Sequence, residues 1–135
     1  MQYRTLGKTN FNISEISLGT WQVGGKWGSP FDPNNAEKIL KTAIDNGVNF
    51  IDTADVYSDG LSEKAVGKAV NSYQQKIYIA TKCGRKFQPH VDASYTLISL
   101  RKSVEDSLQN IGVDHIDLIQ LHCPPWETYY RPEVF

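Results

Sequence analysis

The sequence predicts an α/β fold in which parallel strands alternate with helices, and three observations lead to this class. Strand-like apolar runs recur at intervals of roughly thirty to forty residues, the spacing of right-handed crossover units. The segments between them have the apolar periodicity of amphipathic helices. Capping residues and glycines mark where these helices begin and end.

The composition is that of an ordinary globular protein and excludes several classes of function. Of the 135 residues, 40% are hydrophobic and 21% are charged, and the formal net charge is -1. This balance offers no basic surface for nucleic acid or an anionic membrane, and no apolar run approaches the ~20 residues of a membrane span. No signal-peptide core is present at the N-terminus, and two cysteines cannot form a disulfide framework. We therefore expect a cytoplasmic protein.

The first 14 residues predict a β-hairpin that stands before the main fold. Strand-like pieces at 2–4 and 11–13 flank a turn at 7–10, which contains glycine and asparagine. The first core strand is expected to end at 19–21, and a glycine-rich loop follows over 22–31.

The first helix has a start signal, an apolar stripe and a stop signal. Asp32 is the predicted N-cap, and Pro33 suits the first helical position. Gly47 provides the left-handed residue that ends the helix. The stripe consists of Ala36, Ile39, Leu40, Ala43 and Ile44.

Three further strands, two further helices and the start of a last helix complete the pattern. The strands are expected at 48–51, 77–81 and 116–121, and Ser62 is the predicted cap of the second helix. A loop is expected over 83–93, and a last helix is predicted to start near 132. The third helix is predicted to end at Gly112 and to bury Leu97, Val104, Leu108 and Ile111.

Four polar side chains of different chemistry fall near the carboxyl ends of these strands. Asp52, Lys82 and His122 each directly follow a strand, and Tyr57 lies in the loop after one. Ligands of parallel α/β sheets bind at this edge, which we call the carboxyl edge. A single residue of any of these four types is more often a helix cap, a solvated charge or a packing residue. A functional site is indicated only because the four occupy equivalent positions in successive βα units. An inward-facing Asp52 and Lys82 must pair, because burying either charge alone costs on the order of several kcal/mol.

Together these residue types predict proton transfer to a carbonyl oxygen. The Lys82 ammonium would make the Tyr57 phenol a better proton donor, and Asp52 would hold Lys82 charged and in place. His122 could donate to, or orient, the same oxygen. A hydride would have to come from a cofactor, because no side chain supplies one.

Four segments of the chain resemble the aldo-keto reductase family. They are Tyr3–Thr9, Leu18–Trp21, Phe50–Tyr57 with Gly60, Ser62 and Glu63, and Asp117–His122. The resemblance implies a (βα)8 TIM barrel, of which this chain holds the N-terminal hairpin (1–14) and about four βα units (15–135), up to the start of the fourth helix. It implies NAD(P)H-dependent reduction of aldehydes or ketones, usually with NADPH, although NADH stays open. Tyr57 would be the proton donor, Lys82 and Asp52 its tuning pair, and His122 the substrate orienter.

The resemblance also implies where cofactor and substrate lie. Gly19, Thr20, Trp21 and Asp52 would border the nicotinamide, and Trp21, Tyr57 and His122 would contact a small carbonyl substrate. A complete barrel needs about 250 residues or more. The family's residues that stack on the nicotinamide, hold its carboxamide and bind the 2′-phosphate have no counterpart here, and Pro125 stands where the family often has aspartate.

Two alternatives to an active reductase stay open. The chain could be a truncated, catalytically incomplete half-barrel that acts only as a folding or association module, because an open half-barrel leaves unpaired strand edges and an apolar face that favour self-association. A flavodoxin-like sheet of four or five strands would explain the length, but it gives Lys82 and His122 no role.

Several aromatic residues lie near the carboxyl edge. We expect Trp21 to form an aromatic wall of the site, whereas packing is an equal alternative for Trp27 and Trp126. His90 and His115 are expected to be exposed loop residues.

Cys83 and Cys123 follow Lys82 and His122 on strands that should be neighbours. We expect inert thiols; a bridge formed on oxidation stays open, because adjacent strands lie ~4.8 Å apart. The spacing of these cysteines does not predict a metal site.

Overall fold

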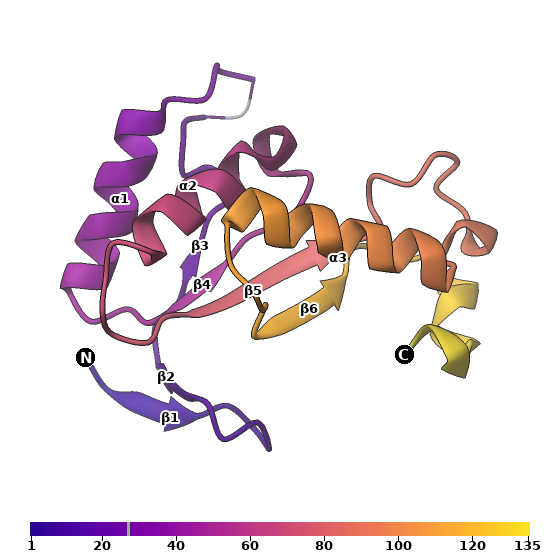
Figure 1. Ribbon diagram of the computed structural model, residues 1–135, viewed down its shortest axis with the longest axis horizontal. Helices are drawn as coiled ribbons and strands as arrows, with labels where there is room; N and C mark the ends of the chain where they lie inside the picture. Colours follow the sequence, from indigo (N-terminus) through magenta and orange to yellow (C-terminus); the bar gives the residue numbers. More distant parts are fainter. Residues whose placement is uncertain (27) are drawn as a thin grey trace.

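The main element of the fold is a sheet of four parallel strands, seen in a computed structural model that describes residues 1–26 and 28–135. The strand order is β3 (Leu18–Gly19), β4 (Phe50–Asp52), β5 (Tyr78–Cys83) and β6 (Leu118–Leu121). The crossover helices α1 (Pro33–Asp45), α2 (Leu61–Val70) and α3 (Leu97–Ile111) cover one face of the sheet, with α2 between the other two (Figure 1). The βα alternation predicted from the sequence is confirmed.

An antiparallel hairpin of β1 (Tyr3–Thr5) and β2 (Asn12–Ser14) lies at the amino ends of the strands (Figure 1). Asn49, which directly precedes β4, ties the hairpin to the sheet. Its side-chain oxygen accepts from the Ser14 backbone N–H at 2.6 Å, and its own N–H donates to the Ser14 hydroxyl at 3.1 Å. The hairpin therefore closes the edge opposite the predicted site.

The predicted ends of the helices are confirmed except at the start of α2. The Asp32 carboxylate accepts from the N–H groups of Asn34 and Asn35, at 2.9 and 3.1 Å. Left-handed Gly47 and Gly112 end α1 and α3. The prediction that Ser62 caps α2 is wrong, because left-handed Gly60 holds that position and Ser62 is buried inside the helix. Within the described residues, no helix is long and apolar enough to cross a membrane.

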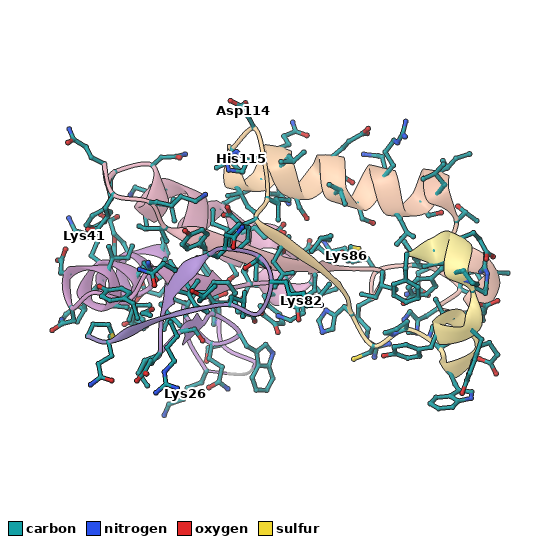
Figure 2. All side chains as sticks on the ribbon, turned by 90° about the horizontal axis from the view of Figure 1, so that it is seen from below. Lys26, Lys41, Lys82, Lys86, Asp114 and His115 are labelled. Atoms are coloured by element: carbon teal, nitrogen blue, oxygen red, sulfur yellow. The ribbon has the colours of Figure 1, made fainter. Side chains whose placement is uncertain are left out.

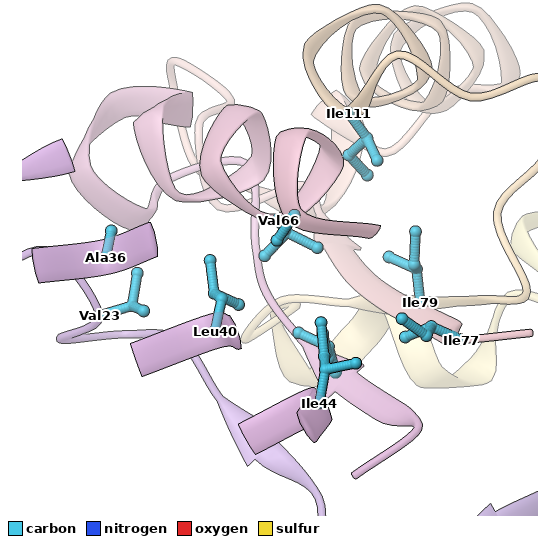
Figure 3. Close-up of a cluster of buried hydrophobic side chains, with 10 residues drawn as sticks. Val23, Ala36, Leu40, Ile44, Val66, Ile77, Ile79 and Ile111 are labelled. Atoms are coloured by element: carbon cyan, nitrogen blue, oxygen red, sulfur yellow. The ribbon is translucent and has the colours of Figure 1, made fainter. Parts of the chain in front are cut away.

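The hydrophobic core fills the space between the helices and the sheet (Figure 3). It confirms the stripe of α1, of which Ala36, Leu40 and Ile44 are fully buried. The prediction that Leu97 is buried is wrong, because its exposed fraction is 71%. The first turn of α3 extends past the carboxyl ends of the strands, where no sheet lies beneath it (Figure 1). The core consists of Val23, Ala36, Leu40, Ile44, Ile51, Val66, Ala69, Ile77, Ile79 and Ile111.

The last described residues form two short 3-10 helices, Trp126–Tyr130 and Pro132–Val134, and the second begins where the start of a last helix was predicted. Asp92, in the segment between β5 and α3, anchors them. Its carboxylate accepts from the Thr128 hydroxyl at 2.9 Å and from the Arg131 guanidinium at 3.2 Å.

Gly67 provides a test of the packing between α2 and α3. A Cβ atom at Gly67 would lie 1.8 Å from the backbone oxygen of Ile111, which cannot move aside by changing a rotamer. Helix propensity alone would favour alanine by about 1 kcal/mol. The clash should dominate, so we predict that Gly67→Ala lowers the free energy of unfolding by about 1–3 kcal/mol in urea denaturation.

Gly19→Ala is the matched control, because among the described residues a Cβ there has no neighbour within 4 Å. It should leave the free energy of unfolding nearly unchanged. A Gly67→Ala protein as stable as the parent would contradict the close contact.

Candidate active site

Strand register brings the predicted side chains to one face at the carboxyl edge. Asp52 on β4 is opposite Ala80 on β5, and Lys82 on β5 is opposite Gln120 on β6. Ile51 and Ile79, at alternate positions, point to the helices and are buried in the core. Because side chains alternate along a strand, Asp52, Lys82 and Gln120 face away from the helices.

The Lys82 ammonium group joins the other polar groups of this edge. Its Nζ atom lies 2.5 Å from Asp52 Oδ1, 2.9 Å from the Thr53 carbonyl oxygen and 3.2 Å from the Tyr57 hydroxyl oxygen. An ammonium has three donors, so each has an acceptor here. Gln120 Nε2 donates to the second Asp52 oxygen at 3.2 Å. The ion pair of Lys82 and Asp52 is largely shielded from water, because the exposed fractions of the two side chains are 16% and 30%.

Tyr57 reaches Lys82 from the turn that follows β4. The next three residues, Ser58, Asp59 and Gly60, all have left-handed backbone conformations and reverse the chain into α2. Two of them are not glycine, which costs on the order of 1 kcal/mol each. Lys86 Nζ lies 3.2 Å from the Asp59 carboxylate at the solvent-exposed side of this turn, where an ion pair contributes little to stability.

His122 stands beside Tyr57 at the end of β6. The two rings are perpendicular, with centroids 5.9 Å apart, and the His122 backbone N–H donates to the Cys83 carbonyl at 2.7 Å. Burial lowers the pKa of His122, and the positive charges of Lys82 and Arg85 lower it further. The imidazole is therefore neutral at pH 7, with one nitrogen a donor and the other an acceptor. Nδ1 is buried and has no hydrogen-bond partner among the described residues.

Hydroxyl groups beneath the edge fix the backbone of Asp52. Both the N–H and the hydroxyl of Thr20 donate to the Asp52 carbonyl, at 2.9 and 3.0 Å. The Ser62 hydroxyl donates to the Thr20 hydroxyl at 2.8 Å and lies 3.0 Å from that of Thr53. The Thr20 side chain, predicted to border the cofactor, is thus buried and engaged with the protein.

A cavity of about 900 Å³ opens at the carboxyl edge. Trp21 lines it, with 53% of its surface exposed, whereas Trp126 is absent from its described lining and packs against Tyr130 with ring centroids 5.3 Å apart. The predicted aromatic role of Trp27 lies outside the described residues. The lining also includes Tyr57, His122, Gln22, Lys26, Phe31, Arg85, Gln88 and His90.

The segment after β5 contributes residues that the sequence did not predict. His90 is half-buried, and its Nε2 lies 3.0 Å from the hydroxyl of buried Tyr95, so the expectation of an exposed loop histidine is wrong. His115 is exposed, as predicted. Gln120 could have been found from strand parity. The same reasoning could not have found Arg85, His90 and Tyr95, because the segment after β5 has no periodicity that fixes the direction of a side chain.

The two cysteines are free thiols in different surroundings. Cys83 is buried, and burial raises the pKa of its thiol to about 11, so it is unreactive at neutral pH. Cys123 is exposed.

Parallel strands with helices on one face and polar side chains at the carboxyl edge are typical of α/β barrels, whose ligands bind at that edge. The family model described as the aldo/keto reductase family matches residues 15–135. The chain is 35% identical to the aldo-keto reductase YhdN of Bacillus subtilis over 127 residues, which cover 92% of this chain and 38% of YhdN. The chain therefore belongs to the aldo-keto reductase family.

Solved structures agree with this assignment. The holo form of aldo-keto reductase AKR11C1 from Bacillus halodurans superposes with a TM-score of 0.74 at 33% identity, covering 90% of this chain and 40% of that one. An aldo-keto reductase from Klebsiella pneumoniae in complex with NADP and acetate gives a TM-score of 0.66 at 26% identity, covering 82% and 36%. The chain thus spans about two fifths of the length of its relatives, and its sheet is part of a (βα)8 barrel.

Asp55, next to the site residues, is a buried carboxylate. Its exposed fraction is 5%, and Oδ1 has no hydrogen-bond partner among the described residues. Burial raises its pKa to about 6 from 3.8, against the opposing positive charge of Lys86, and the negative charge of Glu63 adds to the rise. Between these two pH values the folded state holds a proton that the unfolded chain releases, so stability falls as the pH rises through this window.

We therefore predict that Asp55→Asn stabilises the protein at about pH 7.5 and not below about pH 4, because the amide cannot ionise. The expected gain is at most about 3 kcal/mol at the higher pH, from urea denaturation at both pH values. Asp114→Asn, at an exposed loop position, is the control and should show no such pH dependence. Equal stability of parent and Asp55→Asn at both pH values would contradict the account.

Proposed function

We propose that residues 15–135 carry the proton-transfer and substrate-orienting groups of an NAD(P)H-dependent reductase of aldehydes or ketones. Family membership supports the reaction class, and the contact between Lys82 and Tyr57 supports the assignment of roles. The chain spans about two fifths of the length of its relatives. That the whole protein reduces a carbonyl substrate is therefore itself a proposal.

In this proposal Tyr57 is the proton donor. Its oxygen accepts a hydrogen bond from the Lys82 ammonium, so its own O–H is free to donate to a carbonyl oxygen in the cavity. When the proton leaves, the adjacent positive charge stabilises the phenolate. Asp52 keeps Lys82 in position for this step.

His122 is proposed to orient the carbonyl group. It lines the same cavity as Tyr57, and its neutral imidazole can donate one hydrogen bond to the substrate oxygen. Two donors directed at one oxygen stabilise the negative charge that develops there during reduction.

The surface at the end of β3 suits a flat cofactor ring. Gly19 is exposed, and a Cβ there would meet none of the described residues within 4 Å, so the backbone is open to close approach. Trp21 adds an aromatic face at the cavity wall, and Asp52 lies opposite Gly19 in the sheet. We propose these three residues as neighbours of the nicotinamide, and Thr20 as the residue that positions Asp52. NADPH would supply the hydride, in line with the NADP complex of the Klebsiella protein, and NADH stays an alternative.

We predict that Tyr57→Phe lowers the rate of NADPH oxidation with an aromatic aldehyde by about 10²- to 10⁴-fold, because it removes the proton donor and little volume. Absorbance at the nicotinamide band follows the reaction. Tyr130→Phe, an exposed position outside the described cavity lining, is the control and should retain the parental rate. Equal rates for the parent and Tyr57→Phe would remove the assigned role.

The same preparation tests the alternative of an association module. The outer edges of β3 and β6 have no strand partner among the described residues, and Ile119 on β6 is 42% exposed. An inactive parent chain that light scattering shows to be a multiple of 15.2 kDa would favour this alternative.

A further inference from the structure

The cavity has an uncompensated positive wall. Two cationic side chains, Lys26 and Arg85, line it, and no Asp or Glu is among its described lining residues. The nearby Asp52 carboxylate does not offset this charge, because it is paired with the Lys82 ammonium and accepts a hydrogen bond from Gln120. Neither Lys26 nor Arg85 forms an ion pair within residues 1–26 and 28–135. The formal net charge of the whole chain is -1, so this positive charge is a local property of the cavity.

The exposed Arg85 side chain contacts a histidine and, within the described residues, no carboxylate. Its Nη1 atom lies 3.4 Å from His90 Nδ1, and His90 Nε2 lies 3.0 Å from the Tyr95 hydroxyl. A guanidinium only donates, so Nδ1 must be the acceptor and Nε2 must carry the proton that is donated to Tyr95. Tyr95 is fully buried, and burial raises its pKa to about 12, so it stays neutral. The contacts from Arg85 through His90 to Tyr95 therefore orient the guanidinium without cancelling its charge.

The positive charge extends to the reacting end of the cavity. Arg85 and Lys82 both contribute to lowering the pKa of His122, which lies beside Tyr57. A neutral substrate interacts with this field only through its dipole and the charge that develops on its carbonyl, whereas an anionic group within the cavity is attracted by its full charge. The planar guanidinium of Arg85 also offers two parallel donors, the geometry that matches a carboxylate.

We propose that this cavity selects carbonyl substrates that carry a carboxylate or a similar anionic oxygen group, with Arg85 as the recognising residue and Lys26 as a second positive charge. The inference rests on the proposed function for the position of the carbonyl, at Tyr57 and His122. The volume of about 900 Å³ leaves room for an anionic group at a distance from the carbonyl.

The test compares two aldehydes that differ in charge, 4-carboxybenzaldehyde and its neutral methyl ester. The parent should show a kcat/KM at least about tenfold higher for the carboxylate, and Arg85→Gln should bring the ratio near one, by raising KM more than it lowers kcat. Arg85→Lys should restore part of the preference, because it keeps the charge and loses the planar pair of donors.

Lys41→Gln is the control, because it removes the same charge from an exposed position on α1. Figure 2 shows Lys41 and Lys26 projecting from different parts of the molecule. This variant should keep the parental preference. A preference that Lys41→Gln reduces as much as Arg85→Gln does would assign the effect to net charge and overturn the proposal.

A binding measurement separates this inference from the proposed function. Calorimetric titration of the same two aldehydes into the parent and Arg85→Gln requires no turnover. A parent that reduces neither aldehyde, yet binds the carboxylate at least about tenfold more tightly in an Arg85-dependent way, would refute the reductase and support the anion site. Equal binding of the two aldehydes, or binding of neither, would overturn the anion site.

NADPH is a second source of anionic oxygen groups, so its affinity is measured in parallel. The proposal predicts that Arg85→Gln leaves the Kd of NADPH unchanged. A weaker affinity for NADPH, with an unchanged ratio between the aldehydes, would assign Arg85 to the cofactor and contradict the proposal.

Discussion

The fold depends on keeping one ammonium group compensated at the carboxyl edge of its sheet. Lys82 projects from β5 with most of its side chain shielded from water, and such a charge is stable only if its donors are satisfied. Three acceptors from one short stretch of the chain meet this requirement. Asp52 ends β4, the Thr53 carbonyl follows it, and the Tyr57 hydroxyl comes from the next turn. The parallel register of β4 and β5 brings them together, so the chemistry of the site follows from strand pairing.

The supporting polar groups lie beneath this edge, between the sheet and the helices. Thr20 holds the Asp52 carbonyl, and Ser62 ties Thr20 to the first turn of α2. Glu63, the next residue, is fully buried and accepts hydrogen bonds from the Thr81 hydroxyl at 2.7 Å and the Asn110 amide at 3.0 Å. Its place in the first turn of α2 helps offset the cost of burying its charge. Strands and helices are thus linked by polar contacts directly under the site, which limits how far the functional side chains can move.

Sequence periodicity predicted the parts of this arrangement that repeat along the chain. Strand ends, helix stripes and the caps at Asp32 and Gly47 are local properties, and the meeting of Asp52 with Lys82 follows from them once the strands are parallel. Ser62 was misread because a serine next to a glutamate before an apolar stripe resembles a cap, and only the tertiary contact with Thr20 shows that it is buried. The positive cavity wall was missed because composition averages charge over the whole chain, whereas the direction of Arg85 depends on a segment without periodicity.

The most direct test of this account is a double-mutant cycle between Asp52 and Lys82. Asp52→Asn, Lys82→Met and the double variant are compared with the parent by urea denaturation at about pH 7. If the two groups stabilise each other as the geometry indicates, the single changes are not additive, and the coupling free energy is about 1–3 kcal/mol. A coupling free energy indistinguishable from zero would mean that Lys82 is compensated in some other way, and it would contradict the arrangement on which the proposed chemistry rests.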